Sequence, residues 1–248
     1  GILEMTSVLK KSIFTTSLIG LLVLAIAAPA QGGSVNKSVR IGDGETSGEA
    51  SSVNGSITVG EQAVVNGEVS TVNGTIRIDD DAQVEDVSTV NGAVRIGAGV
   101  MSENVSTVNG SIRVDESVTI DGYIEAVNGS IGVEKGTTID RDVSNVNGNI
   151  ELTGSQIGGD LSTVNGDVIL ADGTILRGDL IVEKPGGWNW GWKKRKPPTV
   201  IIGPGSRVLG TIKLEREVEL YISESAEVGG VEGEMAMSDA VRFGGDRP

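Results

Sequence analysis

Residues 106–114 read Ser-Thr-Val-Asn-Gly-Ser-Ile-Arg-Val, and the Val-Asn-Gly at the centre of this stretch returns along the chain at an almost fixed interval. Its asparagines lie 18 or 19 residues apart, at Asn54, Asn73, Asn91, Asn109, Asn128, Asn147 and Asn165. A fainter copy places Asn36 another 18 residues before the first of them. Self-similarity at a period of about twenty residues is typical of solenoids, in which each unit buries its apolar face by stacking on its neighbours.

Within one unit, aliphatic and polar residues alternate as they do in strands. In the unit that starts at Val108, the pairs Ile112/Val114 and Val118/Ile120 each repeat with a period of two. Asn-Gly, Asp-Gly or a lone Gly separates many of these stretches, and Asn-Gly favours a turn because both residues tolerate positive φ. Three short strands in 18–20 residues predict one coil of a parallel β-helix. We therefore expect an all-β, single-domain β-solenoid of about ten coils.

The fold explains why the asparagine is repeated. Coils stack about 4.8 Å apart, so equivalent residues of successive coils lie above one another. The asparagines from Asn36 to Asn165 are predicted to form a ladder at one corner, with each buried amide bonded to the next. The glycine after the asparagine would let the backbone turn where a Cβ would clash. Ser-Thr pairs predict a second polar stack, at residues 70–71, 88–89, 106–107 and 162–163.

The repeat continues past the last Val-Asn-Gly in an altered form. Residues 202–212 and 222–231 carry similar glycine-containing stretches that are offset by 20 residues. We assign residues 31–231 to the β-helix and residues 232–248 to a C-terminal cap or tail. The apolar side chains of this tail that are expected to lie over the last coil are Met235, Met237 and Phe243.

Residues 1–30 have the features of an N-terminal remnant followed by a cleavable signal peptide. Lys10 and Lys11 precede an apolar run over residues 18–28, and Ala-Pro-Ala at residues 28–30 fits a cleavage site. The run is shorter than the ~20 residues that a membrane-spanning helix needs, which favours cleavage over an anchor. We therefore expect the mature chain to be exported to the periplasm or the outer surface of a bacterium.

The composition argues against several classes of function. The chain has no Cys and no His, which removes disulfides, His-based triads and most zinc sites. Its net charge of −14 repels nucleic acid. We expect no catalytic residues, no metal, no cofactor and no nucleic-acid partner.

One segment departs from the repeat. Residues 185–198 contain all three tryptophans of the chain and four consecutive cations, and without these 14 residues the spacing from Gly178 to Gly210 falls from 32 to 18. We interpret the segment as a loop insertion between two coils. Tryptophans beside cations suit lipid headgroups or an acidic glycan. The candidate contact residues are Trp188, Trp190, Trp192, Lys193, Lys194, Arg195 and Lys196. Alternatively, the loop folds back, so that its tryptophans cover a coil face and its cations pair with the acidic rod.

Two acidic clusters, Asp79 to Asp81 and Asp115-Glu116, are candidates for a calcium site or a glycosidase site. Glycoside hydrolysis needs two carboxylates at a defined separation in a cleft, and these clusters lie in corners without insertions that would build one. The Gly-Gly-x-Gly-x-Asp repeats of calcium-bound β-rolls are absent. We interpret both clusters as solvated faces.

The unit S-T-V-N-G-x-[IV]-x-[VIL], as in residues 70–78 and 106–114, resembles the repeat of bacterial exported adhesin-like β-solenoid domains. The later I-x-G-x-[IL] coils are similar to bactofilins, the polymer-forming cytoskeletal β-helix proteins. Together the resemblances cover about residues 35–231, and they imply a right-handed β-helix without enzyme activity. Bactofilins lack a cleavable leader, so an envelope scaffold or adhesin is favoured over a filament subunit, and a glycan-active β-helix enzyme is the third alternative.

The two ends of the rod bear on assembly, because exposed strand edges invite pairing. The first coil carries Lys37, Gly48 and Glu49 and few aliphatics, and the C-terminal tail breaks the repeat. Both features favour a monomer over end-to-end assembly.

Overall fold

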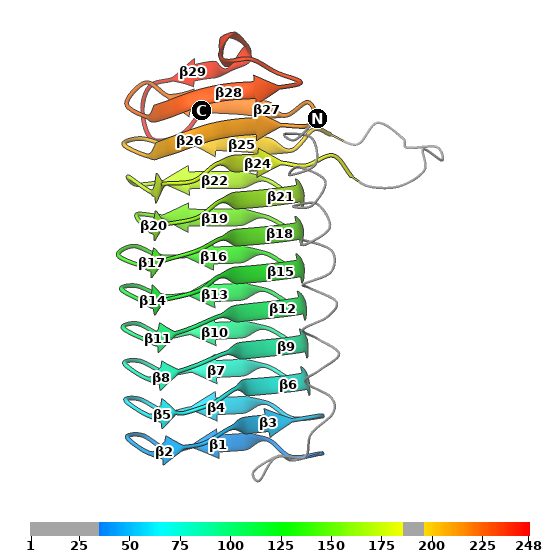
Figure 1. Cartoon of the computed structure of the whole chain (residues 1–248), viewed down its shortest axis with the longest axis vertical. Coiled ribbons are helices and arrows are strands. Elements are labelled where there is room, and N and C mark those ends of the chain that lie inside the picture. The colour runs from blue at the N-terminus through cyan, green and yellow to red at the C-terminus, as the bar shows by residue number, and fades with distance from the viewer. Residues whose placement is uncertain (1–34, 186–195) are drawn as a thin grey trace, which may run out of the picture.

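The structure, a computed structural model, describes residues 35–185 and 196–248 and confirms the predicted fold class (Figure 1). The described chain is nearly all-β and forms a parallel β-solenoid of about ten turns. The predicted remnant and signal peptide, residues 1–30, lie outside the described residues. No helix in the described part of the chain has the length and apolar composition that a transmembrane segment requires.

Each regular turn contains three short strands, as the repeat predicts. The first strand of each turn belongs to an 11-stranded parallel sheet made of β1 (Val39–Ile41), β4 (Ile57–Val59), β7 (Ile76–Ile78), β10 (Val94–Ile96), β13 (Ile112–Val114), β16 (Ile131–Val133), β19 (Ile150–Thr153), β22 (Val168–Ala171), β25 (Thr199–Ile202), β27 (Glu219–Ser223) and β29 (Val241–Phe243).

The other two strands of each turn belong to an 18-stranded sheet. The two-residue strands are β2 (Thr46–Ser47), β5 (Val64–Val65), β8 (Gln83–Val84), β11 (Met101–Ser102), β14 (Thr119–Ile120), β17 (Thr138–Ile139), β20 (Gln156–Ile157) and β23 (Ile175–Leu176). The longer strands are β3 (Ala50–Ser52), β6 (Val69–Asn73), β9 (Val87–Asn91), β12 (Val105–Asn109), β15 (Ile124–Asn128), β18 (Val143–Asn147), β21 (Leu161–Asn165) and β24 (Leu180–Val182). Near the C-terminus, β26 (Arg207–Leu214) and β28 (Glu227–Gly233) each replace both strands of a turn.

The interior is filled by aliphatic side chains that stack in register from turn to turn. Ile76, Val94 and Ile112 occupy one such row, and each is at most 1% exposed. The residue between the two inward-facing aliphatics of each first strand points outward, as the alternation of buried and exposed residues in β7, β10 and β13 shows. Because the stacking is in register, every outward position also forms a column along the rod.

Apolar side chains of residues 232–248 lie against the C-terminal end of the rod. Met235 and Met237 pack against the core, and Phe243 is 8% exposed. A short 3₁₀ helix, η1 (Met237–Asp239), connects β28 to β29, which pairs with β27. The last long strand, β28, runs to Gly233 and so continues two residues past the expected end of the repeat at residue 231.

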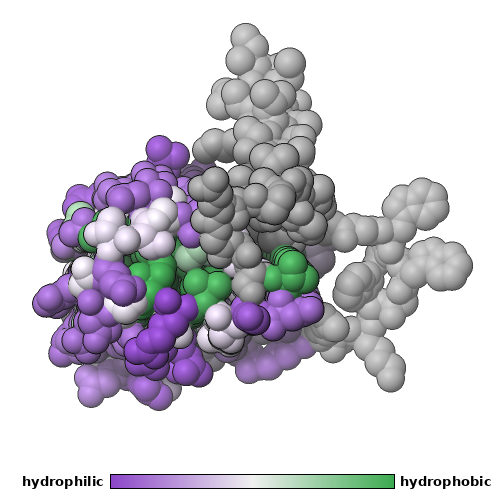
Figure 2. Space-filling model, turned by 90° about the horizontal axis from the view of Figure 1, so that it is seen from below, coloured by the Kyte–Doolittle hydropathy of each residue, from purple (hydrophilic) through white to green (hydrophobic). Residues whose placement is uncertain are grey.

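The N-terminal end is less covered by the described chain. Among the described residues, β1, β2 and β3 each have a parallel partner on one side only. Figure 2, which views this end, shows hydrophobic residues at its centre within a hydrophilic ring.

Candidate functional site

The asparagine ladder is present along one corner of the rod. Each side-chain Nδ2 donates to the Oδ1 of the asparagine one turn earlier, from Asn54–Asn36 through to Asn165–Asn147. The donor–acceptor distances lie between 2.8 and 3.1 Å. All the amides therefore point the same way, and the ladder has a donor end at Asn36 and an acceptor end at Asn165.

The prediction that this ladder is buried is wrong. Seven of its asparagines are exposed and Asn165 is half-buried, because they stand at the corner itself and not on an inward strand position. Water can therefore hydrogen-bond the amide edges that the ladder leaves free.

For this reason Asn109→Leu is expected to lower the free energy of unfolding by about 1 kcal/mol or less, since water replaces both lost partners. Urea denaturation followed by circular dichroism would measure the change. Asn66→Leu is a matched control, because Asn66 is exposed and its side chain forms no hydrogen bond among the described residues. A loss of several kcal/mol at Asn109 would show that water does not reach the ladder.

The glycine that follows the ladder asparagine from Asn54 onward stands where a Cβ would clash, as the repeat predicts. At Gly74, Gly92 and Gly110, φ is outside the positive region, so the turn itself does not demand glycine. The close approach of successive turns demands it, because a Cβ built on Gly110 would lie 1.8 Å from the carbonyl oxygen of Gly92. The corner is thus packed backbone against backbone.

The predicted Ser-Thr stack is also present, as two separate columns. In the threonine column the side chains are buried, and those of Thr71, Thr89 and Thr107 bond the corner glycine of the previous turn, as Thr107 Oγ1 does to the carbonyl oxygen of Gly92 at 3.1 Å. The Thr163 hydroxyl is buried and has no hydrogen-bond partner among the described residues. The serine column runs beside it, with Ser106, Glu125 and Ser144 in register. The bonded threonines therefore tie their strands to the glycine corner.

Glu125 takes a serine position in this column and is 9% exposed. Burial raises the pKa of its carboxyl from 4.5 to about 7, and a hydrogen bond with the Ser144 side chain opposes that shift. Composition and spacing gave no indication of this group, because a glutamate at a variable strand position is usually solvated.

The insertion enters and leaves the solenoid at the ladder corner. It separates β24 from β25, whereas the pairs β24–β26 and β22–β25 continue in register on either side of it. Residues 186–195, which include Trp188, Trp190, Trp192, Lys193, Lys194 and Arg195, lie outside the described residues. Lys196 is described, and its Nζ lies 3.1 Å from the Glu219 carboxylate, so this one cation pairs with the acidic rod as the alternative interpretation expects.

Cations replace asparagine where the ladder meets the insertion. Thr163, Val182 and Leu214 are in register in successive turns. Asn165 lies two residues after the first of them, and the residues at the same offset in the next two turns are Lys184 and Arg216. Arg216 reaches past the turn that carries the insertion, and its Nη1 donates to Asn165 Oδ1 at 3.2 Å. A guanidinium thus closes the acceptor end of the ladder, 51 residues away in sequence.

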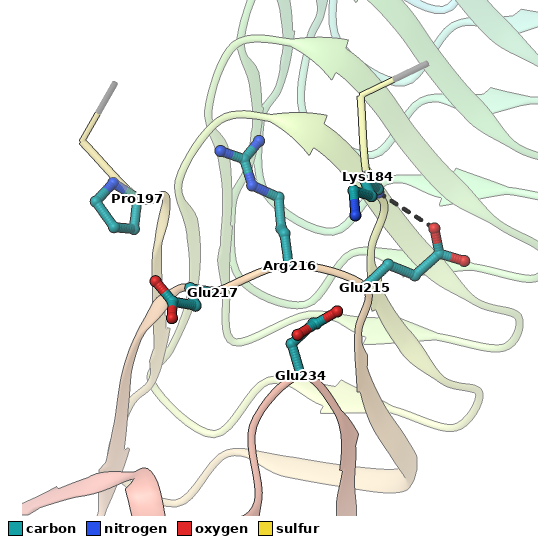
Figure 3. Close-up of a pocket in the computed structure, with 6 residues that line it drawn as sticks. All are labelled: Lys184, Pro197, Glu215, Arg216, Glu217 and Glu234. Carbon is teal, nitrogen blue, oxygen red and sulfur yellow. Dashed lines mark hydrogen bonds between the residues drawn. The ribbon is translucent and has the colours of Figure 1, made fainter. Parts of the chain in front are cut away.

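An open hollow of about 340 Å³ lies at this place (Figure 3). It is lined by Lys184, Pro197, Glu215, Arg216, Glu217 and Glu234. The Lys184 backbone N–H donates to Glu215 Oε2 at 3.2 Å, which ties the first residues of the insertion to the next turn. Both ends of the insertion are therefore held on the rod by acidic residues.

A column of arginines on the 11-stranded sheet was missed by sequence reasoning. Arg77, Arg95 and Arg113 are exposed and pair directly in register on β7, β10 and β13. We refer to these three residues as the arginine column. The sequence does contain a pattern that predicts this column, because Arg follows the Val-Asn-Gly-x-aliphatic stretch in three consecutive copies. Elsewhere in the repeat other residues occupy this position.

The acidic clusters have structural partners. Asp79 Oδ1 pairs with Arg77 Nε at 2.5 Å, and Asp80 Oδ1 accepts from the Ala98 backbone N–H at 2.9 Å. Within residues 35–185 and 196–248, no group of three or more Asp and Glu side chains is arranged to hold a metal ion.

Comparison of the chain with models of protein families, with curated protein sequences and with solved structures gave no match. Of what the family resemblances imply, the structure shows the parallel β-solenoid of about ten turns.

Proposed function

We propose that the chain is a non-catalytic scaffold or adhesin-like protein, exported to the periplasm or outer surface of a bacterium. In this proposal residues 185–198 contact an anionic envelope component, either lipid headgroups or an acidic glycan. The main support for the proposal is the strand register around the insertion. β22 pairs with β25, and β24 with β26, in register, although the insertion lies between β24 and β25. A regular solenoid with one inserted Trp-rich basic segment is suited to holding that segment at its surface, where it can contact a partner.

Charge supports the same proposal. The chain carries a net charge of −14, so its surface repels anionic partners at long range. Each cation near an anionic membrane contributes about 1 kcal/mol, and salt screens the repulsion within about 10 Å. Four consecutive cations beside three tryptophans can therefore attract an anionic surface locally.

Deleting residues 185–197 is expected to abolish cosedimentation with anionic vesicles or with cell-wall material while leaving the melting temperature nearly unchanged. The deletion leaves four residues between Val182 and Val200, as many as lie between Thr163 and Val168 in the previous turn. It also keeps Pro198, whose carbonyl oxygen accepts from the Glu219 N–H at 2.8 Å.

A matched control replaces Lys135, Arg141, Arg177 and Arg207 by glutamine, which removes four positive charges but leaves the insertion intact. This control should bind like the parent protein at the same ionic strength. If the deletion variant binds as well as the parent, or if it unfolds, the insertion is a packing element and the proposed contact site is wrong.

The alternative function, a bactofilin-like filament subunit, draws support from the N-terminal strands that have one described partner each. Charge at the ends opposes it. The first turn carries Asp43, Glu45 and Glu49, and the last turn carries Glu227, Glu232 and Glu234, so end-to-end docking would bring like charges together. We therefore expect an elongated monomer in analytical ultracentrifugation across a wide range of protein concentration. Filaments in negative-stain images at physiological ionic strength would favour the alternative.

A further inference from the structure

We propose that the outer face of the 11-stranded sheet is a binding site for a linear polysaccharide that carries carboxylate or sulfate groups. The arginine column would provide its main contacts. This inference goes beyond the proposed function, because it concerns a second face of the rod and does not depend on residues 185–198.

The first observation is that the arginine column places like charges directly opposite one another. Arg77 pairs in register with Arg95, and Arg95 with Arg113. Side chains in such positions are close neighbours, and like charges there are destabilising. Other turns carry Thr58, Gly132 or Glu151 at this position, so the fold does not require arginine. Three successive turns thus concentrate guanidinium groups at a position that the fold leaves free to vary, which suits a ligand with a repeating negative charge.

The second observation is that the rod neutralises only part of the column by direct ion pairs. Arg77 pairs with Asp79, but among the described residues neither Arg95 nor Arg113 forms an ion pair. The residue two positions after Arg95 is Gly97, where the neighbouring turns have Asp79 and Asp115. Arg95 therefore lacks the carboxylate two residues on that Arg77 and Arg113 have in their own turns.

The third observation is the polar surface beside the column. In each of the three turns a ladder asparagine lies four residues before the arginine, separated from it by a glycine, a small residue and an aliphatic, as in Asn91-Gly-Ala-Val-Arg95. Each exposed amide uses one N–H of its Nδ2 in the ladder and has a second one left to donate. Three successive turns thus repeat one set of donors: an amide and a guanidinium beside a small side chain.

This arrangement favours an anionic polysaccharide over other polyanions. The planar guanidinium bonds carboxylate and sulfate groups through two parallel N–H donors. The donor set recurs once per turn, about every 4.8 Å, which suits an extended polymer with one charge per sugar unit. Duplex nucleic acid carries a charge much denser than one per about 4.8 Å. Residues 69–122 contain no aromatic side chain on which the bases of a single strand could stack.

The test is titration calorimetry of the full chain with polygalacturonate at low salt. Replacing Arg77, Arg95 and Arg113 together by glutamine should weaken binding about tenfold or more. The same loss should appear in the chain that lacks residues 185–197, which separates this site from the insertion. Circular dichroism should show an unchanged fold and a melting temperature that is equal or higher, because the repulsion within the column has been removed.

Replacing Lys135, Arg141 and Arg177 by glutamine is the matched control, since it changes the net charge equally on exposed positions outside the column. It should bind polygalacturonate like the parent. The inference is overturned if the parent does not bind, if the control loses as much affinity as the arginine variant, or if binding depends only on residues 185–197. It is also overturned if the arginines are needed for anionic vesicles but not for polygalacturonate, which would assign the face to a lipid surface.

Discussion

Gly110→Ala is expected to lower the free energy of unfolding by about 3 kcal/mol, the largest effect that we predict for a single methyl group in this chain. The added Cβ would lie 1.8 Å from the Gly92 carbonyl oxygen and 2.4 Å from its carbonyl carbon. Both are backbone atoms, so no side chain can rotate away. The two turns must separate, which would weaken the bond from Thr107 Oγ1 to the same carbonyl oxygen.

Gly132→Ala is the matched control for this clash. Gly132 lies in β16, and a Cβ built on it meets no atom within 4 Å. Alanine there should be neutral or slightly stabilising, because glycine in a strand loses more conformational freedom on folding. Urea denaturation of the two variants side by side would decide the matter. Equal stability of the two would mean that the corner can open without cost.

Glu125→Gln is expected to raise the stability of the protein at pH 8 by about 1–3 kcal/mol and to leave it nearly unchanged at pH 4. Burial raises the pKa of the Glu125 carboxyl to about 7 in the folded chain, whereas an exposed glutamate titrates at about 4.5. Below pH 4.5 the carboxyl is protonated in both the folded and the unfolded state. Between pH 4.5 and 7 only the unfolded chain releases the proton, so the stability of the parent protein falls as the pH rises, and glutamine removes that loss.

Thermal unfolding of both proteins from pH 4 to pH 8 would measure this dependence. Glu103→Gln is a suitable control, because it makes the same replacement at an exposed position. A constant difference between the Glu125 variant and the parent at all pH values would indicate a packing effect in the serine column and not a titration.

The repeat alone predicted much of the candidate site, because stacking in register converts a sequence period into a spatial column. The Asn109–Asn91 bond and the in-register stacking of Ser106-Thr107 on Ser88-Thr89 both follow from that one rule. The predicted burial of the amides was wrong, whereas the predicted Cβ clash at the corner glycines is confirmed, although Gly74, Gly92 and Gly110 do not use a positive φ. Periodicity shows which residues lie above one another, but it does not show which side of the backbone faces water.

The sequence by itself determined the solenoid, its three strands per turn and the asparagine ladder, since these depend only on identical residues recurring at a near-constant spacing. Only the tertiary structure revealed the contact of Arg216 with Asn165 and the burial of Glu125. It also showed that Arg95 and Arg113 form no ion pair within the described part of the chain. Each of these depends on what occupies the adjacent turns at one height of the rod. That environment differs from turn to turn even where the repeat does not, because charge and solvation are set by neighbours in space.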